Sequence, residues 1–255
     1  MENLKKLVEI VARLRAPDGC PWDRQQDHSS LRPYILEEAY ETIEAIDEKN
    51  DEKLAEELGD LLLQIMLHAR IAAEREAFDI ETVAAMISRK LIDRHPHVFE
   101  SKKEITAREV LHNWERIKQR QAKNHDYSVL QGVPAASPAL LKAFRVQEKV
   151  GRYGFDWKKP DDVIEKVKEE IEEFNRAFAD GDQDRMEEEF GDLLFSLVNL
   201  GRHYKLQAES ALNRTTNKFI KRFQYIEEKL RSRGRTLDQS NLEEMDGLWQ
   251  EAKKS

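Results

Sequence analysis

Turn-forming residues are scarce in this sequence of 255 residues, which contains ten glycines and seven prolines. This scarcity argues against β-sandwiches, barrels and glycine-rich dinucleotide-binding folds, because all of these use many turns. The single cysteine, Cys20, excludes an intrachain disulfide and fits a reducing compartment. No apolar run approaches the roughly 18 residues of a membrane span, and the charged amino terminus lacks a signal-peptide core. We therefore expect a cytoplasmic chain without a membrane partner.

Acidic residues outnumber basic ones by 50 to 42, which gives a net charge of −8. This balance argues against nucleic acid as a partner, because the phosphate backbone attracts basic surfaces. A polyanionic ligand would therefore need a cation to mediate its binding.

Apolar residues recur at three- and four-residue steps through most of the chain, which is typical of helices. No segment has the pattern of a strand. The predicted fold class is all-α, with two tandem helical-bundle domains at 1–122 and 139–255 joined by a linker at 123–138. The predicted helices cover about 4–14, 33–48, 52–76, 80–94, 106–122, 139–151, 161–179, 183–206, 208–232 and 243–253.

An internal repeat relates the two halves. Residues 37–63 align with 169–195 at a constant offset of 132 without a gap, and ten of the 27 positions are identical. The shared stretches EELGDLL and EEFGDLL include a glycine, which acidic composition alone does not explain.

Each repeat carries two pairs of acidic residues at i,i+3 spacing, one pair on either side of a short polar turn. On a helical wheel each pair flanks the apolar face, and an antiparallel hairpin places the pairs opposite each other at similar heights. The two predicted quartets are Glu38, Glu41, Glu57 and Asp60, and Glu170, Glu173, Glu189 and Asp192.

Carboxylates this close repel one another by about 3–4 kcal/mol per pair at an effective dielectric constant near 20. A divalent cation removes that penalty, and all-oxygen ligands favour Mg²⁺, Mn²⁺ or Ca²⁺ over zinc. We expect Mg²⁺, with Mn²⁺ as a substitute. One isolated pair would be typical of a solvated helix face, but the same paired motif in both halves favours a site.

His95 and His97 flank Pro96 without a cysteine or third histidine, which favours a turn over a metal site.

Five segments and one tryptophan together resemble a known family. They are GCPWDRQQDHSSLRPYILEEAYE (19–41), EELGDLL (56–62), GFDW (154–157), EEFGDLL (188–194) and NKFIKRF (217–223), together with Trp249. These segments resemble the MazG-type nucleoside triphosphate pyrophosphohydrolases, and the resemblance covers nearly the whole chain. It implies an all-α homodimer of tandem domains. It also implies Mg²⁺-dependent cleavage of standard and non-standard ribo- and deoxynucleoside triphosphates to a monophosphate and pyrophosphate.

The resemblance also implies roles for individual residues. The second quartet would hold the metal, with the first as its counterpart. Because Glu169 and Glu188 are adjacent in sequence to these ligands, we expect one of them to position a water or a second cation. The expected nucleotide contacts are Lys218, Arg222 and, as a weaker candidate, Lys118 for the phosphates, and Trp249 for the base. Without the resemblance, a lone lysine is typical of solvated surface and a tryptophan of packing.

Two alternatives stay open at this point. One is a noncatalytic helical interaction or regulatory module whose acidic stripes bind a basic partner, although such a module does not require Gly59 and Gly191. The other is a redox di-metal enzyme, which the missing Glu-x-x-His motifs disfavour.

The two halves differ in their basic residues. The position in the first half that is equivalent to Lys218 is Met86, so the second half is predicted to carry most turnover.

Overall fold

The computed structural model describes the chain except for residues 1, 101–104, 107–108, 111–112, 115–127 and 255. It contains helices and no strand in the described part, which confirms the all-α class. No described helix is both long and apolar enough to span a membrane. Lys118 and most of the predicted helix 106–122 lie outside the described residues.

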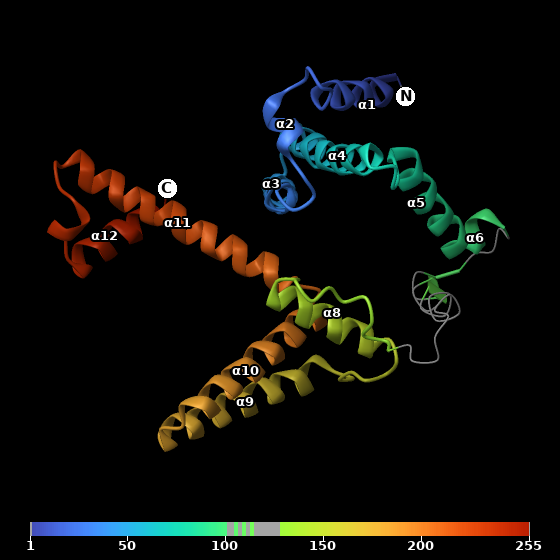
Figure 1. Cartoon of the computed structure of the whole chain (residues 1–255). Helices are drawn as coiled ribbons and strands as arrows, with labels where there is room; N and C mark the ends of the chain where they lie inside the picture. The colour runs from blue at the N-terminus through green and yellow to red at the C-terminus, as the bar shows by residue number, and fades with distance from the viewer. Residues whose placement is uncertain (1, 101–104, 107–108, 111–112, 115–127, 255) are drawn as a thin grey trace. The chain divides into compact units, whose positions relative to one another are not determined.

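The chain divides into two compact units, Met1–Lys118 and Gln119–Ser255 (Figure 1). The domain boundaries at 122 and 139 remain predictions. The helices of the first unit are α1 (Glu2–Leu14), α2 (Pro21–Gln25), α3 (Arg32–Glu48), α4 (Asp51–Glu74), α5 (Ile80–Arg94) and α6 (Pro96–Phe99). Those of the second are α8 (Ala139–Gly151), α9 (Pro160–Asp180), α10 (Gln183–His203), α11 (Ala208–Ser232), the 3₁₀ turn η1 (Leu237–Gln239) and α12 (Leu242–Ala252).

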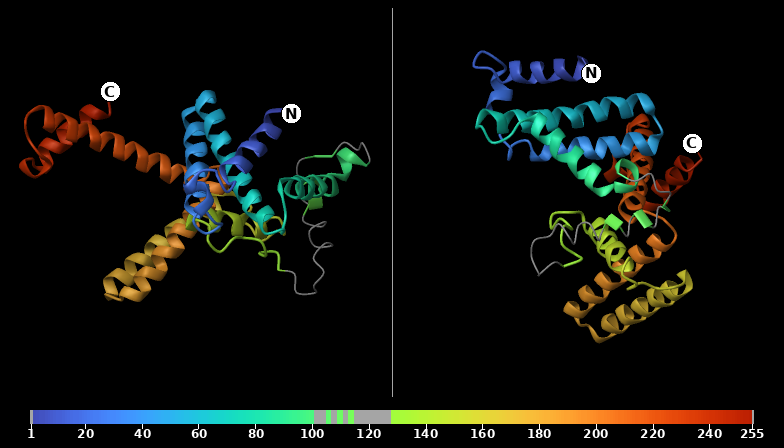
Figure 2. Two further views of the ribbon diagram at one scale, coloured as in Figure 1. Left: turned by 45° about the horizontal axis from the view of Figure 1, so that its top comes forward. Right: turned by 90° about the vertical axis from the view of Figure 1, so that its right-hand side faces the viewer.

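An antiparallel hairpin dominates each unit: α3 packs on α4, and α9 packs on α10 (Figure 2). In the first unit α1 contacts α4. In the second unit α8 contacts α10 and α11, and α12 packs on α11. The repeat predicted from sequence is therefore a repeat of helical hairpins.

The two hairpin turns are closed in the same way at equivalent positions. Lys49 (φ 55°) and Gly181 (φ 70°) both adopt the left-handed conformation that ends the first helix. One residue later, Asn50 and Asp182 each accept the backbone N–H three residues on, at 3.1 Å, and so cap the second helix. The offset of 132 thus holds for the backbone as well as for the sequence.

A fully buried alanine sits inside each hairpin near the turn. Ala45 and Ala177 are both 0% exposed, and their carbonyls accept the backbone N–H of Asn50 and Asp182 at 3.2 and 3.3 Å. A small side chain at this position lets the two helices approach closely. That approach brings the carboxylates of facing helices within reach of one another.

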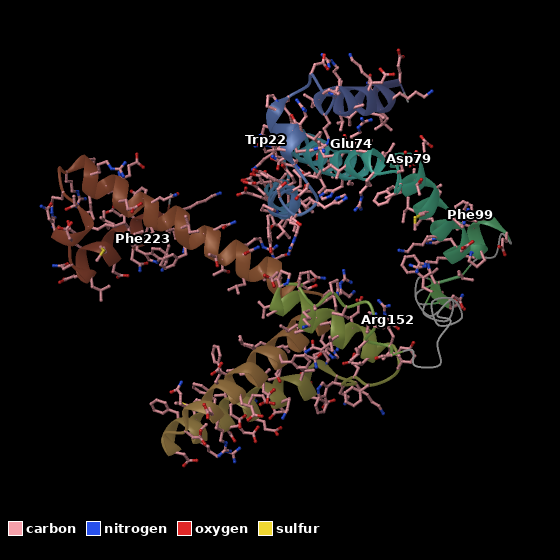
Figure 3. The ribbon with its side chains drawn as sticks, viewed as in Figure 1. Trp22, Glu74, Asp79, Phe99, Arg152 and Phe223 are labelled. Carbon is pink, nitrogen blue, oxygen red and sulfur yellow. The ribbon has the colours of Figure 1, made fainter. Side chains whose placement is uncertain are left out.

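The core of the first unit joins α1, the start of α3 and α4. Arg15, after α1, donates three hydrogen bonds to Glu74 of α4, at 2.9, 3.0 and 3.3 Å, and lowers the pKa of that carboxyl (Glu74 is labelled in Figure 3). The buried apolar residues of this core are Val11, Leu31, Met66, Leu67 and Ile71.

Truncation of Leu31, which is 0% exposed, tests this core. Leu31→Ala should lower the free energy of unfolding of the first unit by about 3 kcal/mol, because it leaves a cavity. Hydrogen exchange of the α4 amides measures this unit separately. Leu242→Ala, at a side chain that is 80% exposed in the other unit, is the control and should leave α4 unchanged. Equal protection of α4 in both variants would contradict the assigned core.

Candidate metal and nucleotide site

The first carboxylate group lies on the α3–α4 hairpin. Glu38 and Glu41 of α3 and Glu57 of α4 each offer a carboxylate oxygen, and these oxygens all lie within 4.8 Å of one another. Asp60, predicted as the fourth ligand, is not a member of this group. Its charge nevertheless raises the pKa of both Glu38 and Glu57, so its carboxylate lies near theirs. Because aspartate has one methylene fewer than glutamate, its carboxylate stays closer to its own helix.

No basic side chain of the described residues pairs directly with this first group, and the charge of Lys53 only partly offsets the rise in the pKa of Glu57. Burial raises the pKa of Glu38, and the charges of Asp60 and Glu41 raise it further. Burial and the charge of Glu41 likewise raise the pKa of Glu57, which is only 9% exposed. No hydrogen bond or ion pair reaches the Glu57 carboxylate from the part of the chain that the structure describes. An unpartnered buried carboxylate among like charges fits a divalent cation well.

The second group has the same arrangement on the α9–α10 hairpin. Glu170 and Glu173 of α9 and Glu189 of α10 offer oxygens within 4.8 Å of one another, and Glu170 is 4% exposed. Asp192 is exposed and again stands outside the group. The structure therefore brings together three of the four predicted ligands in each half.

Basic side chains form ion pairs with the carboxylates of the second group, and the sequence analysis did not predict these pairs. Each carboxylate pairs with a basic residue three or four positions away on its own helix, a spacing that was available as a signal. The pairs are Lys166–Glu170 at 2.7 Å, Arg176–Glu173 at 3.2 Å and Arg185–Glu189 at 3.6 Å.

The two predicted water-positioning residues lie outside this group. Glu169 is exposed and pairs with Lys166 at 3.0 Å, and Glu188 is exposed on α10. Both are adjacent in sequence to a buried or half-buried ligand. Both side chains are open to solvent, and neither belongs to the group of three carboxylates.

Apart from Lys118, which lies outside the described residues, the predicted nucleotide-binding residues lie on α11 and α12. The Arg222 guanidinium stands 5.5 Å from the centroid of the Trp249 ring, and Phe219 packs on the same ring at 4.9 Å. Lys218 is exposed. Among the described residues, no hydrogen bond or ion pair joins these side chains to the carboxylate group. The contact of Trp249 with Phe219 required tertiary packing and was not predicted.

His95 and His97 lie next to each other at the start of α6. Their rings lie 5.7 Å apart, and His95 also contacts Trp114 at 5.2 Å. Pro96 begins the short helix α6, where a turn and not a helix had been predicted.

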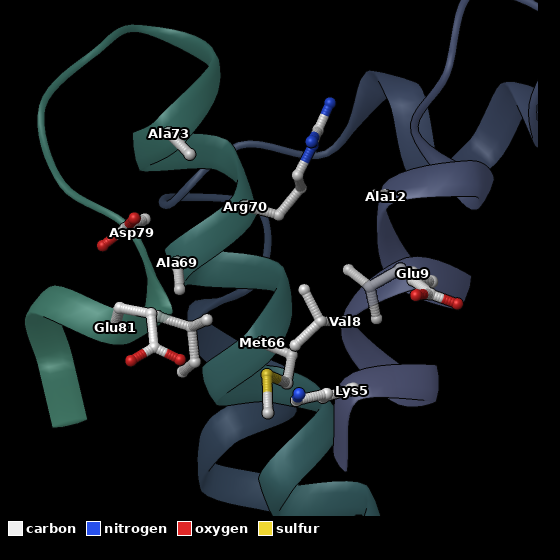
Figure 4. A pocket seen from close by; sticks show the side chains of 12 residues that line it. Lys5, Val8, Glu9, Ala12, Met66, Ala69, Arg70, Ala73, Asp79 and Glu81 are labelled. Atoms are coloured by element: carbon white, nitrogen blue, oxygen red, sulfur yellow. The ribbon is translucent and has the colours of Figure 1, made fainter. Parts of the chain in front are cut away.

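A cavity of about 410 Å³ lies elsewhere in the first unit, between α1, α4 and the start of α5 (Figure 4). Its lining is partly apolar and includes Val8, Met66 and Ala69. None of the eight predicted carboxylate ligands lines it. The charged residues at its rim are Lys5, Glu9, Arg70, Asp79 and Glu81.

Comparison with protein families identifies the class of enzyme that these hairpins define. The model of the MazG nucleotide pyrophosphohydrolase domain matches residues 26–99 and 158–226. Both matches contain one hairpin and its carboxylate group, so the molecule is an all-α nucleotide pyrophosphohydrolase. The chain belongs to the MazG family, which confirms the predicted resemblance.

Individual relatives agree with this assignment. A Thermotoga maritima protein named nucleoside triphosphate pyrophosphohydrolase/pyrophosphatase MazG is 47% identical over 249 residues, covering 98% of this chain and 95% of its own. An Escherichia coli K12 nucleoside triphosphate pyrophosphohydrolase is 41% identical over 258 residues, covering 100% and 98%. The uncharacterized protein YabN of Bacillus subtilis is 46% identical over 247 residues, which span 96% of this chain and 50% of that protein.

Proposed function

We propose that Glu170, Glu173 and Glu189, joined by Asp192, hold a divalent cation with which this enzyme hydrolyses nucleoside triphosphates to nucleoside monophosphate and pyrophosphate. The observation that carries the proposal is the convergence of three carboxylates from two helices within 4.8 Å, inside a matched MazG domain. Mg²⁺ is the proposed ion, because all-oxygen ligands suit it and it keeps positions open for phosphate oxygens. The substrates are ribo- and deoxynucleoside triphosphates, standard and non-standard.

The proposed mechanism divides the work among the residues of the second unit. A bound divalent cation supplies neutralisation of the phosphate charge and of the charge that builds on the leaving pyrophosphate. Lys218 and Arg222 bind phosphate oxygens, and Trp249 lies against the base. Glu169 or Glu188 orients the water that attacks the α-phosphorus in line and accepts a proton from it, as the bond to the bridging oxygen breaks and pyrophosphate leaves.

Product analysis tests the reaction. Each nucleoside triphosphate is incubated with the protein and Mg²⁺, and the products are separated. Monophosphate plus pyrophosphate supports the proposal, whereas diphosphate plus phosphate contradicts it. Because the Thermotoga maritima relative is also named a pyrophosphatase, the assay should follow whether pyrophosphate persists. Absence of turnover would favour a noncatalytic regulatory module.

Thermal stability tests the divalent cation independently of turnover. Mg²⁺ or Mn²⁺ at about 10 mM should raise the melting temperature, because an ion that binds only the folded state at about a thousandfold excess over its Kd stabilises by about 4 kcal/mol. Calorimetry with KCl at matched ionic strength is the control. A combined variant that replaces Glu38, Glu41, Glu170 and Glu173 by glutamine should lose the shift. An unchanged melting curve for the native protein would contradict a metal site.

We also propose that the enzyme is a cytoplasmic homodimer. Both hairpins expose large apolar side chains at equivalent positions: Ile46 and Phe178 are 55% and 69% exposed, and Leu58 and Phe190 are 49% and 50% exposed. Apolar stripes of this kind are typical of an interface that a second copy covers. The cytoplasm is the proposed location because nucleoside triphosphates are made and used there.

Two helical glycines support this interface. An added Cβ at Gly59 or Gly191 meets no atom of the chain within 4 Å, so nothing in the described structure requires a glycine there. A glycine inside a helix costs about 1 kcal/mol relative to alanine. Close approach of a second copy would account for both positions.

Substitution of Gly191 tests this explanation. Gly191→Ala should weaken the dimer even though it favours the helix, because the added methyl group would meet the second copy. Gly247→Ala is a matched control on α12, where an added Cβ also meets nothing. Analytical ultracentrifugation measures both dissociation constants. Equal dimer affinity in the two variants would contradict a close approach at Gly191.

A further inference from the structure

The two carboxylate groups differ in their cationic neighbours. In the second group Lys166, Arg176 and Arg185 lie 2.7, 3.2 and 3.6 Å from the three ligands. In the described part of the first unit, no lysine or arginine pairs with Glu38, Glu41, Glu57 or Asp60. The same hairpin therefore carries a group that is paired directly with basic side chains in one unit, and a group without such pairs in the described part of the other.

Sequence differences at the equivalent positions explain this contrast. The offset of 132 relates Lys166 to Tyr34 and Arg176 to Glu44, neither of which supplies a cation. Arg185 corresponds to Lys53, whose ammonium instead binds Glu44 and Glu48 of α3, both at 3.3 Å.

The compensating cations compete directly with a divalent ion. The Lys166 ammonium occupies hydrogen-bonding distance from a Glu170 side chain that is only 5% exposed. An ion that binds there must displace a charge-assisted hydrogen bond and remain near a positive charge. In the first unit the buried Glu57 carboxylate has no such partner to displace.

We propose that the first group binds a divalent cation directly from solution, whereas the second group binds one only together with the nucleotide. The triphosphate gives Lys166, Arg176 and Arg185 alternative anionic partners when they release the carboxylates. This inference rests on the proposed function, because it assumes that the second group receives a metal–nucleotide complex. Metal loading at the catalytic group is thereby coupled to the presence of substrate.

Mn²⁺ binding followed by electron paramagnetic resonance tests the coupling without turnover. Without nucleotide, Glu170→Gln with Glu173→Gln should retain tight Mn²⁺ binding, and Glu38→Gln with Glu41→Gln should lose it. The analogue α,β-methylene-ATP cannot be cleaved between the α- and β-phosphates. Adding it should restore Mn²⁺ binding to the Glu38/Glu41 variant, to a level above the Mn²⁺ that the analogue binds without protein.

Removal of a basic side chain from the second group provides the converse test. In the Glu38/Glu41 variant, Lys166→Ala should tighten nucleotide-free Mn²⁺ binding on the order of tenfold. Lys166→Gln removes the charge but keeps more of the side-chain volume than Lys166→Ala does, and it should tighten Mn²⁺ binding in the same way. Lys168→Ala is the matched control, since Lys168 pairs with Glu165 at 2.8 Å and not with a ligand, and it should change nothing.

Two outcomes would overturn the inference. One is equally tight nucleotide-free Mn²⁺ binding by both double variants, which would leave the proposed function intact. The other is an absence of Mn²⁺ binding to either group with and without the analogue, which would overturn the proposed metal chemistry as well. Circular dichroism confirms that each variant is folded.

Discussion

Glu170→Gln is expected to reduce pyrophosphate release by at least about a thousandfold, a size typical of losing a group that stabilises transition-state charge. Glutamine has nearly the same volume as glutamate, so the packing around this 4% exposed side chain should survive. The anionic oxygen that a divalent cation requires is lost. Steady-state assays of pyrophosphate release measure the effect, and circular dichroism should show unchanged helicity.

Matched substitutions separate the role of Glu170 from a general effect of charge on α9. Glu189→Gln should be as damaging as Glu170→Gln, because Glu189 belongs to the same group on the facing helix. Glu172→Gln changes the same residue type at an exposed position of α9 outside that group and should alter turnover by less than about twofold. Retained activity in both Glu170→Gln and Glu189→Gln would contradict the assigned site.

Local sequence patterns predicted most of the helical framework. Where they are described, the long predicted helices end within three residues of the observed ones, because apolar periodicity and polar turns are local properties. The short helices α2 and α6 were missed. Both begin at a proline, Pro21 and Pro96, which breaks a helix interior but fits its first turn.

The candidate site was predictable to the extent that it follows helical geometry. The i,i+3 spacing and the turn length placed Glu170 and Glu173 opposite Glu189, and the structure brings them together. The packing of Phe219 on Trp249 was beyond the sequence, because it joins two helices across the intervening η1 turn. Periodicity reports which face of a helix is apolar, but it does not report which partner covers that face.

The second unit is expected to carry most of the nucleotide turnover, although both hairpins assemble a carboxylate group. Lys218 is replaced at the equivalent position by Met86, which is 70% exposed and cannot bind a phosphate. At the position equivalent to Arg222, the first unit has Lys90. This lysine is basic but lacks the planar guanidinium that binds phosphate with two hydrogen bonds. A displaced or missing cation should reduce rate more than metal affinity, because catalysis depends on precise placement of charge.

Two double variants compared side by side test this asymmetry. Glu170→Gln with Glu173→Gln should abolish most pyrophosphate release, whereas Glu38→Gln with Glu41→Gln should retain at least about half of it, within the modest range of effects expected away from the reacting atoms. Ultracentrifugation and circular dichroism establish that both proteins keep the native assembly and helicity. The asymmetry would be wrong if the Glu38/Glu41 variant lost the greater share of activity while remaining folded. The carboxylates alone would then suffice, and the cations of α11 would not distinguish a catalytic hairpin from its structural or regulatory copy.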